Sequence, residues 1–381
     1  MRILIVTETF VPATDGICTR LSHFVVEFKK RGHEVLVVSP DLGISEYEGV
    51  PVIGLDTIKI PFYGSRSWGL PNRQIKKIMK DFNPDIVHAV NPISIATSGV
   101  HYANKLGIPL LTSYHTHMPD YLDYYNLPLF KPALWEYIRF WHQRADYNIT
   151  VSKALMEELI EHEIDTHNVL PRGLDIQERH PDFYDEELYK ELTFNLPNQK
   201  LLVYVGRLAS EKGLRQLRAI LEERDDICLA MVGDGPEREE LETYFEGTKT
   251  TFLGFKFGEE LSKAFATGDA FIFPSTSETF GLVISEAMAS GLPVFAAKSA
   301  PTLEQITHLE TGIVFESNNR ESLIKSMDYL DNALLMQKIK LTARNQVEKY
   351  TWANATQVML DYYQNAIDIH ERRYNKVQKS I

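Results

Sequence analysis

Short apolar runs alternate with helical patterns along the whole sequence, and this series starts twice. In the first half the apolar runs lie at residues 2–7, 34–39, 85–90, 109–114 and 147–151. After the first run, Leu21, Phe24, Val25 and Phe28 have the spacing of one helix face, and Gly32 follows as a stop signal. Strands that alternate with helices in this way predict an α/β fold with a doubly wound parallel sheet.

The second series begins at residue 200. Its apolar runs lie at residues 200–206, 227–232, 250–253, 270–273, 293–296 and 312–315. Because a polar stretch separates the two series, we expect the 381 residues to form two domains, at 1–170 and 171–350. Ligands bind open sheets of this kind at the C-terminal ends of their strands, and two such domains suit two substrates.

The composition limits the kinds of partner that the protein can bind and the cellular compartment that it fits. A formal net charge of −12 argues against nucleic acid as the main partner. Cys18 and Cys228 form neither a disulfide framework nor a zinc-binding spacing, which fits a reducing compartment. The sequence has no signal-peptide pattern and no apolar stretch long enough for a transmembrane helix. We therefore expect a cytoplasmic protein whose membrane contact is peripheral.

Two carboxylates follow the fourth apolar run of the second series. Glu278 lies in the predicted loop, and Glu286 lies eight residues later, about one turn into the predicted helix. The N-terminus of this helix, near Phe280, Gly281 and Leu282, favours a diphosphate, and each carboxylate can accept hydrogen bonds from sugar hydroxyls. The pattern predicts a nucleotide-sugar site. The alternative for two isolated glutamates is a helix cap and a solvated helix residue.

Two cations follow the first strand of the second series. Gly206 ends this strand, Arg207 comes directly after it, and Lys212 follows five residues later. Arg207 can bind phosphate oxygens through two N–H groups, while Lys212 acts as a point charge. A departing nucleoside diphosphate needs positive charge to compensate the negative charge that it develops. The alternative is a turn with two solvated cations. Gly233, in a Gly-Asp-Gly-Pro turn after the next strand, is either a turn residue or a surface for a nucleoside base.

Polar residues also occupy strand ends in the first half. Gly16 lies between the first strand and the first helix and permits backbone approach to a sugar or phosphate, but it belongs to no dinucleotide-binding glycine motif. His115 and His117, with hydroxyl neighbours, end the fourth apolar run. A lone histidine is usually structural, whereas this cluster at a strand end favours a functional site. Because no third ligand has metal-binding spacing, we expect no metal site.

An aromatic segment with interleaved cations spans residues 118–141. The residues expected to contact the acceptor or a membrane are Tyr121, Tyr124, Tyr125 and Trp135. Aromatic and cationic side chains together suit a membrane interface, and core packing is the alternative. A second basic cluster consists of Arg66, Arg73, Lys76, Lys77 and Lys80, which a solvated helix face explains equally well.

Taken together, these motifs resemble the retaining glycosyltransferases of family 4. The resemblance covers nearly the whole chain and rests on the order of the Gly16 loop, the His115 strand end, Gly206-Arg207 with Lys212, the Gly233 turn and the Glu278–Glu286 pair. It implies the GT-B fold, in which two Rossmann-like doubly wound domains face a central cleft. In this family the first domain binds the acceptor, the second binds the nucleotide-sugar, and the last helix, here within 351–381, joins the first domain.

The resemblance also implies roles for individual residues. The expected catalytic residues are His115, Arg207, Lys212 and Glu278, and the expected donor-binding residues are Gly16, Arg172, Gly206, Gly233, Phe280, Gly281, Leu282 and Glu286. A diphosphate oxygen is the usual base in this family, so no protein nucleophile is expected. No DXD-type motif is present, so neither a metal nor another cofactor is expected to be required.

A narrower resemblance concerns the substrates. Ser113-Tyr-His-Thr-His117, with the tyrosines after it, is similar to sulfoquinovosyldiacylglycerol synthases, which use UDP-sulfoquinovose and diacylglycerol. This implies a UDP-sugar, a diacylglycerol acceptor and an anionic membrane surface as partners, with Arg172 as the candidate partner of the sulfonate. The loop at residues 298–304 departs from the glycine-rich loop of many relatives. The alternatives are transfer of glucose or mannose to diacylglycerol or another acceptor, epimerisation of a UDP-sugar on a GT-B fold, and non-catalytic binding.

Overall fold

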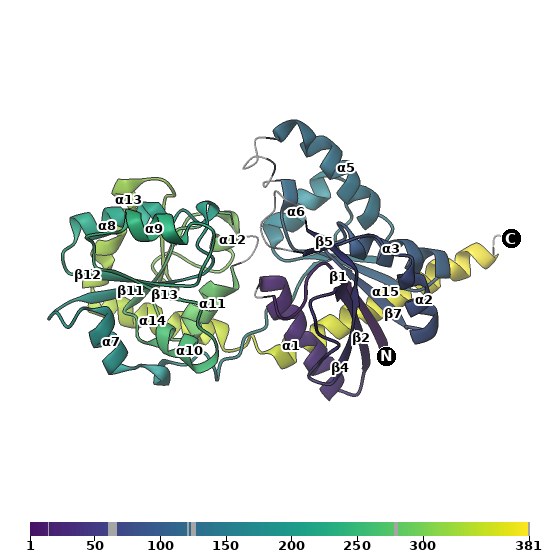
Figure 1. Ribbon diagram of the computed structural model, residues 1–381, viewed down its shortest axis with the longest axis horizontal. Helices are drawn as coiled ribbons and strands as arrows, with labels where there is room; N and C mark the ends of the chain where they lie inside the picture. Colours follow the sequence, from purple (N-terminus) through teal and green to yellow (C-terminus); the bar gives the residue numbers. More distant parts are fainter. Residues whose placement is uncertain (14, 60–66, 120–121, 123–126, 278–280, 380–381) are drawn as a thin grey trace. The chain divides into compact units, whose positions relative to one another are not determined.

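The computed structural model describes residues 1–13, 15–59, 67–119, 122, 127–277 and 281–379 (Figure 1). The chain forms two compact units. Unit 1 consists of Met1–Gly173 and Trp352–Ile381, and unit 2 consists of Leu174–Thr351. The chain therefore passes between the units twice, and the C-terminal helix α15 (Trp352–Lys379) belongs to unit 1.

Among the described residues, unit 1 contains an eight-stranded sheet with the order β10-β9-β8-β7-β1-β2-β4-β3. The strands are β1 (Arg2–Thr7), β2 (Glu34–Pro40), β3 (Glu46–Tyr47), β4 (Val50–Leu55), β7 (Ile86–Val90), β8 (Leu110–Tyr114), β9 (Tyr147–Thr150) and β10 (Asn168–Val169). All neighbours are parallel except β3 and β4. A separate antiparallel pair is formed by β5 (Thr57–Lys59) and β6 (Ser67–Gly69). The strand order reverses between β1 and β7, where ligands bind doubly wound sheets.

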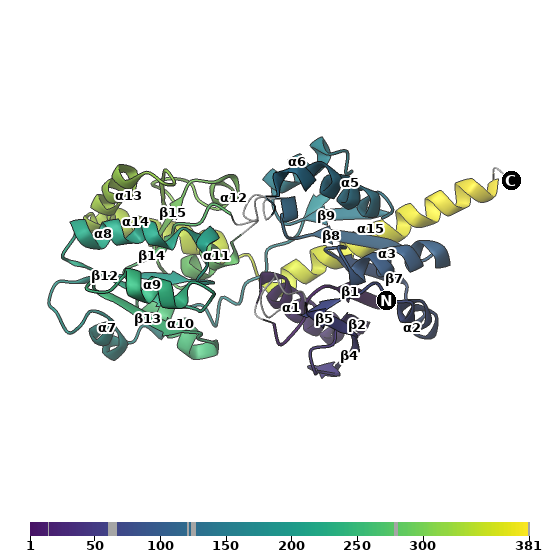
Figure 2. The ribbon, with the colours of Figure 1, turned by 45° about the horizontal axis from the view of Figure 1, so that its top comes forward.

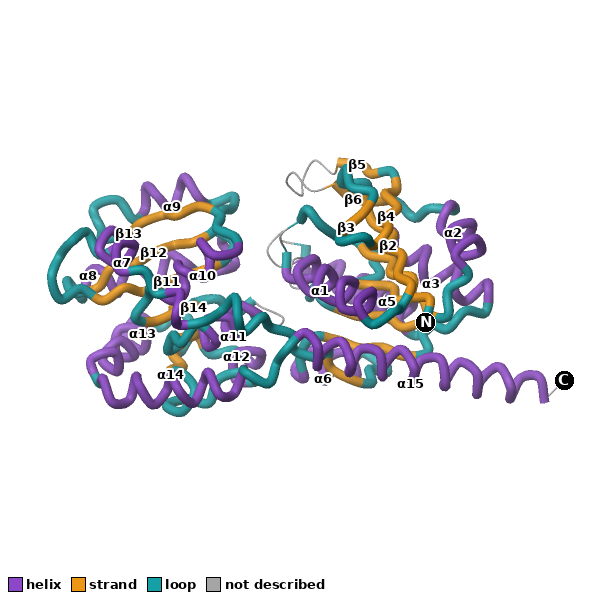
Figure 3. Tube along the Cα trace, turned by 90° about the horizontal axis from the view of Figure 1, so that it is seen from below, coloured by secondary structure: helices purple, strands orange, loops and turns teal. Residues whose placement is uncertain are grey.

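Helices cover both faces of the unit 1 sheet. They are α1 (Gly16–Lys30), α2 (Gln74–Phe82), α3 (Ile95–Leu106), η1 (Pro128–Phe130), α5 (Lys131–His142) and α6 (Lys153–Glu161), together with α15. Leu4 and Val6 of β1 pack with α2 and α3. On the opposite face, α15 packs beside α1 and across β7, β8 and β9, as Figures 2 and 3 show. The apolar stripe predicted for α1 is buried, because it faces this layer.

Unit 2 contains a fully parallel sheet with the order β13-β12-β11-β14-β15-β16 in the described part of the chain. Its strands are β11 (Lys200–Val205), β12 (Ile227–Val232), β13 (Thr250–Gly254), β14 (Ala270–Phe273), β15 (Val294–Ala297) and β16 (Ile313–Phe315). Its helices are η2 (Pro181–Phe183), α7 (Glu186–Leu192), η3 (Ser210–Lys212), η4 (Leu214–Leu217), α8 (Arg218–Glu223), α9 (Arg238–Tyr244), α10 (Gly258–Ala266), α11 (Leu282–Ala289), α12 (Ala300–Leu303), α13 (Arg320–Met327), η5 (Asp328–Asp331) and α14 (Ala333–Val347). The order reverses between β11 and β14. The predicted α/β class with two parallel sheets is confirmed.

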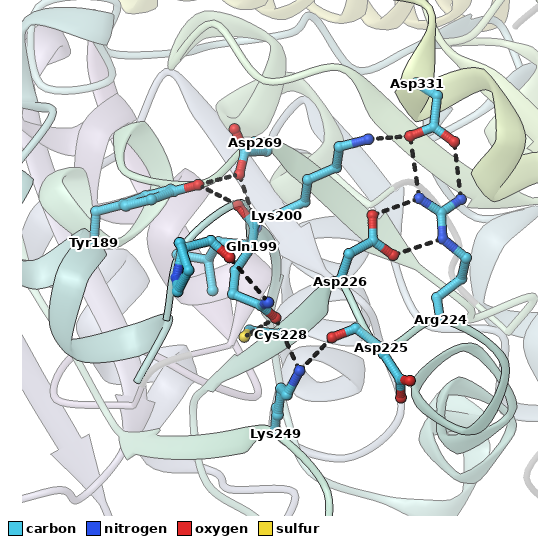
Figure 4. Close-up of polar contacts among 12 residues, drawn as sticks. Tyr189, Gln199, Lys200, Arg224, Asp225, Asp226, Cys228, Lys249, Asp269 and Asp331 are labelled. Carbon is cyan, nitrogen blue, oxygen red and sulfur yellow. Dashed lines mark hydrogen bonds and ion pairs between the residues drawn. The ribbon is translucent and has the colours of Figure 1, made fainter. Parts of the chain in front are cut away.

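Charged side chains tie together the N-terminal ends of the unit 2 strands (Figure 4). Nη2 of Arg224 lies 2.7 Å from Oδ2 of Asp226 and 3.1 Å from Oδ1 of Asp331, and Lys200 also pairs with Asp331. This network lies at the edge of the sheet opposite to the strand ends that carry the predicted site. We therefore assign it to stability.

Candidate active site

The two predicted phosphate-binding cations lie in the loop after β11, at the point where the unit 2 strand order reverses. The N–H of Gly206 donates to the carbonyl oxygen of Val232 at 3.0 Å, which fixes the start of this loop against the end of β12. Arg207 is exposed, and its guanidinium makes no hydrogen bond or ion pair with any residue that the structure describes. Lys212 ends η3 and is half-buried. The loop thus presents an available guanidinium beside a second cation.

Gly233 permits the close packing of the two neighbouring loops. Its φ is 128°, and a Cβ atom at this position would lie 2.0 Å from the carbonyl oxygen of Gly206. A residue with a side chain would push the loop after β12 away from the cation loop. Gly233 therefore has a structural reason to be glycine, whereas its contact with a nucleoside base stays a prediction.

The loop after β14 begins and ends next to residues of the predicted site. Glu278 and Phe280 lie outside the described residues. Before them, the hydroxyl of Ser277 donates to the carbonyl oxygen of Glu211 at 2.9 Å, which joins this loop to the cation loop. After them, Gly281 has a φ of 72° and precedes Leu282, the first residue of α11. Ser277, before the start of α11, is thus joined to the loop that carries Arg207 and Lys212.

Glu286, on α11, is held by a buried arginine that the sequence does not predict. Oε1 of Glu286 accepts a hydrogen bond from Nε of Arg179 at 3.2 Å, and Nη1 of Arg179 donates to the hydroxyl of Ser262 at 2.9 Å. The guanidinium also lies 5.7 Å from the centre of the Phe265 ring. Glu286 is consequently more ordered than a solvated helix residue. Its Oε2 makes no hydrogen bond with the described part of the chain.

In unit 1, His115 follows β8 and is almost fully buried. Its Nε2 lies 2.8 Å from the hydroxyl oxygen of Ser113. Its backbone N–H and that of Thr116 donate to the side-chain oxygen of Asn91, at 3.2 Å and 3.3 Å. Burial holds the pKa of His115 well below its usual 6.5, and the charge of Arg20 acts in the same direction. His115 is therefore neutral near pH 7.

The neighbouring histidine has a different environment. Nε2 of His117 lies 2.9 Å from Oε1 of Glu158 on α6, and its ring lies against Trp135 with centroids 5.7 Å apart. His115, by contrast, is hydrogen-bonded to the hydroxyl of Ser113. The two adjacent histidines that the sequence groups together thus have separate partners.

The first two turns of α1 carry the predicted Gly16 and a buried cation, Arg20. Gly16 is the first residue of α1 and is exposed, and a Cβ atom there would meet nothing within 4 Å. Packing therefore does not require glycine at this position. Arg20, one turn later, is buried, and burial together with the charge of Arg172 lowers its pKa to about 10. Arg172, the predicted sulfonate partner, is thus one of the charges that act on Arg20.

The structure describes only part of the aromatic segment. Tyr121, Tyr124 and Tyr125 lie outside the described residues. Trp135 is only 9% exposed, and its ring stacks on His162 with centroids 3.8 Å apart, as core packing would give. Its contact with the acceptor or a membrane stays a prediction. The exposed apolar side chains nearby are Leu127, Leu129, Phe130, Tyr137 and Phe140. We call these five residues the η1–α5 surface.

The described residues contain neither a helix that could span a membrane nor a cluster that could hold a metal ion. None of the helices there is both long and apolar enough to cross a membrane. Within the same residues, no group of three or more His, Cys, Asp or Glu side chains is placed to hold a metal ion.

Comparison with known proteins decides the family. Residues 14–178 match the model of Glycosyltransferase Family 4, and residues 186–346 match that of Glycosyl transferases group 1. A sulfoquinovosyl transferase of Arabidopsis thaliana is 34% identical over 92% of this chain and 71% of its own length. The chain belongs to glycosyltransferase family 4. This confirms the predicted family and the predicted enzyme class.

Other relatives of this glycosyltransferase differ in their substrates. A GDP-mannose-dependent alpha-mannosyltransferase of Mycobacterium tuberculosis is 31% identical, with 96% of each chain covered. An alpha-monoglucosyldiacylglycerol synthase of Streptococcus pneumoniae is 27% identical over 91% of this chain and 83% of its own length. The names of these relatives thus cover three different sugars.

The solved structures confirm the fold. Anabaena HepE, solved in complex with UDP and glucose, has a TM-score of 0.75 and 21% identity, with 95% of this chain and 98% of that chain covered. A glycosyltransferase from Rickettsia africae has a TM-score of 0.74, also at 21% identity, with coverages of 96% and 99%. The glycosyltransferase therefore has the predicted GT-B fold.

Proposed function

We propose that this glycosyltransferase transfers sulfoquinovose from UDP-sulfoquinovose to diacylglycerol, with retention of configuration. The observation that carries the transferase chemistry is the exposed Arg207 in the same loop as Lys212, with Ser277, before the start of α11, hydrogen-bonded to that loop. The choice of sugar is supported by the similarity to the Arabidopsis sulfoquinovosyl transferase. The choice of lipid is supported by the similarity to the diacylglycerol glucosyltransferase of Streptococcus pneumoniae.

In the proposed reaction, the bond from the anomeric carbon to the diphosphate oxygen breaks. The hydroxyl oxygen of diacylglycerol bonds to the same face of that carbon, and its proton moves to the departing diphosphate oxygen. Arg207 and Lys212 stabilise the negative charge that develops on the diphosphate, which is where fixed charges contribute most to rate. No protein nucleophile takes part.

The remaining site residues hold the donor. Glu286, ordered by Arg179, accepts hydrogen bonds from the ribose hydroxyls through its second carboxylate oxygen. Glu278 accepts hydrogen bonds from the hydroxyls of the transferred sugar, and His115 orients that sugar. A neutral His115 suits this role, because a hydrogen bond to a sugar hydroxyl needs no ionic partner.

Arg172 is the proposed partner of the sulfonate. It lies close enough to the buried Arg20 for its charge to lower the pKa of that residue. Two nearby positive charges in a medium of low dielectric favour an anion such as a sulfonate. Lys298, in the loop at residues 298–304, pairs with Glu316 at 2.7 Å.

A comparison of donors tests the proposal. Transfer to diacylglycerol in vesicles should be about 10-fold or more faster from UDP-sulfoquinovose than from UDP-glucose, because a charge-assisted hydrogen bond contributes roughly 1.5–3 kcal/mol. Arg172→Ala should remove most of this preference and leave UDP binding intact. Lys298→Ala is the matched control and should keep the preference. Efficient transfer from UDP-glucose, with none from UDP-sulfoquinovose, would assign the chain to the neutral glycolipid synthases.

We also propose that unit 1 binds the membrane that contains the acceptor. The η1–α5 surface exposes 91% of Leu129 and 59% of Phe130. The guanidinium of Arg144 lies over the Phe140 ring at 3.4 Å, which puts a cation beside the apolar side chains. Apolar side chains with adjacent cations are suited to the interface of an anionic bilayer.

A further inference from the structure

A chain of buried hydrogen bonds joins the C-terminal helix to His115 within unit 1. The hydroxyl oxygen of Tyr363, on α15, lies 2.9 Å from Nδ1 of His88 on β7. Nε2 of His88 lies 2.7 Å from the hydroxyl oxygen of Ser113 on β8. The same oxygen lies 2.8 Å from Nε2 of His115. We call Tyr363, His88 and Ser113 the relay. Each of its members is at most 1% exposed.

Each side chain in this series of hydrogen bonds has only one proton to donate. Burial lowers the pKa of His88 to about 3 and holds the pKa of His115 well below 6.5, so near pH 7 each ring is neutral and carries its proton on one nitrogen. Burial also raises the pKa of Tyr363, so its hydroxyl stays protonated. The charge of Arg20 further disfavours protonation of His115. In two orientations these hydrogen bonds all run in one direction. In a third arrangement Ser113 accepts from both histidines, and its own hydroxyl proton then has no acceptor in the described part of the chain, which is unfavourable.

In the first orientation, Tyr363 donates to Nδ1 of His88, and the proton of His88 lies on Nε2. His88 then donates to Ser113, and Ser113 donates to Nε2 of His115. The proton of His115 consequently lies on Nδ1. All hydrogen-bonding atoms between Tyr363 and Nε2 of His115 are satisfied in this arrangement.

In the second orientation every bond is reversed, and Tyr363 accepts from His88. The hydroxyl proton of Tyr363 is then left without an acceptor, because its oxygen has no other hydrogen-bond partner in the part of the chain that the structure describes. An unsatisfied buried hydroxyl is unfavourable. The first orientation should therefore predominate by roughly 10-fold or more.

We propose that Tyr363, His88 and Ser113 are positioning residues that hold His115 in the tautomer with its proton on Nδ1. The purpose of this arrangement rests on the proposed function, in which His115 orients the transferred sugar. Nδ1 of His115 makes no hydrogen bond with a described residue, so it can donate to an oxygen of that sugar. An N–H donor suits a hydroxyl oxygen and also the oxygens of a sulfonate, which only accept. The opposite tautomer presents a lone pair, which can accept from a hydroxyl but repels the oxygens of a sulfonate.

The tautomer can be measured directly, without donor or acceptor. The experiment is nitrogen NMR on the full chain labelled with ¹⁵N at histidine, with signals assigned by their loss in His115→Gln and His88→Gln. We expect His115 to be protonated on Nδ1 and His88 on Nε2. Protonation of His115 on Nε2 in the wild-type protein would overturn the proposal, whatever the variants do.

Two variants test the relay itself. Tyr363→Phe removes only the hydroxyl. The preference of His115 for the tautomer with its proton on Nδ1 should then be nearly lost, and both tautomers should be detected. Ser113→Ala removes the hydrogen bond to His115, so both tautomers of His115 should be detected in this variant too. Tyr362→Phe is the matched control, because Tyr362 lies on the same helix but donates to the carbonyl oxygen of Val169 at 3.1 Å. An unchanged Nδ1-protonated His115 in both relay variants would refute the role of the relay.

Kinetics separate this inference from the proposed function. In Tyr363→Phe and Ser113→Ala, kcat for sugar transfer should fall by about 2- to 10-fold, the range for loss of one buried hydrogen bond, with little change in UDP affinity. Tyr362→Phe should keep the wild-type kcat. If the NMR result holds but no UDP-sugar is transferred to diacylglycerol, the proposed function fails and the relay stands.

Discussion

The guanidinium of Arg207 is the most direct point at which to test the chemistry. Replacement by alanine removes charge that acts mainly on the departing diphosphate, so kcat should fall by roughly 100-fold or more. Lys212→Ala should have a similar effect. Arg215, an exposed neighbour that pairs with Glu240 at 2.7 Å, provides the control, since Arg215→Ala should retain wild-type turnover. Thermal unfolding should be unchanged in all three variants. Wild-type kcat in both Arg207→Ala and Lys212→Ala would disprove the assignment.

The role of Glu286 can be tested with the nucleotide alone. If its carboxylate accepts from the ribose hydroxyls, the wild-type protein should bind UDP about 10-fold more tightly than 2′-deoxy-UDP, as expected for a hydrogen bond to a charged group. Glu286→Gln should reduce the ratio of the two affinities toward one. Titration calorimetry with UDP and 2′-deoxy-UDP measures both affinities. Glu260, on α10, is exposed, and Glu260→Gln should preserve the ratio. A ratio near one in the wild-type protein would contradict the role of Glu286.

At the scale of residues, the sequence identifies the candidate site residues better than it identifies the side chains that contact them. Glu286 stands out because of its spacing from Glu278, but Arg179 comes 107 positions earlier, in a polar stretch that has no motif. The contact of His88 with Tyr363 joins positions 275 apart. Side chains become partners across such distances only when the chain folds, so periodicity and local motifs contain no signal for them.

At the scale of elements, continuous apolar runs are reliable predictors of central strands. The run at 227–232 coincides with β12, because both faces of that strand are covered and every residue is buried. The sequence does not predict β4. It contains Pro51 and Gly54, and its burial is irregular because it lies near the edge of the sheet. Nor does it predict the two-residue strand β10, which is too short for a periodic pattern.

The network at the N-terminal edge of the unit 2 sheet should affect stability and not activity. Arg224→Met should lower the free energy of unfolding by about 1 kcal/mol at pH 7, a modest value because Asp226 and Asp331 are partly exposed to solvent. Urea unfolding measures this loss. Arg320, whose pairs with Glu222 and Glu223 are exposed, is the control, and Arg320→Met should change the stability by less than about 0.5 kcal/mol.

The same network should make the stability of the protein depend on pH in a definite direction. Hydrogen bonds from Arg224 lower the pKa of Asp226, and those from Lys200 and Arg224 lower the pKa of Asp331, in each case below the usual 3.8. The stabilisation is therefore fully present above pH 3.8 and is lost as the pH falls toward the lower values of the folded state. The stability difference between the wild-type protein and Arg224→Met should shrink on acidification. A difference that stays constant below pH 3.8 would exclude these carboxylates as its source.

At the scale of the whole molecule, a net charge of −12 opposes binding to an anionic membrane. Screening limits this repulsion, because charges farther away than a Debye length of about 8 Å contribute little at physiological salt. Local groups then decide the interaction. α2 exposes Lys77 and Lys80, and the η1–α5 surface exposes Leu129 and Phe130. The two features make separable contributions, since one is electrostatic and the other is apolar.

Vesicle flotation distinguishes these contributions. The wild-type protein should float with anionic vesicles better than with neutral ones, and added salt should reduce the difference. Lys77→Gln with Lys80→Gln should weaken binding to anionic vesicles only, whereas Leu129→Asp with Phe130→Asp should weaken binding to both kinds. Leu334, 81% exposed on α14 of unit 2, is the control, and Leu334→Asp should float like the wild-type protein. Equal recovery of the wild-type protein with both vesicles at low salt would refute the electrostatic contribution. Full flotation of the Leu129 and Phe130 variant would refute the apolar one.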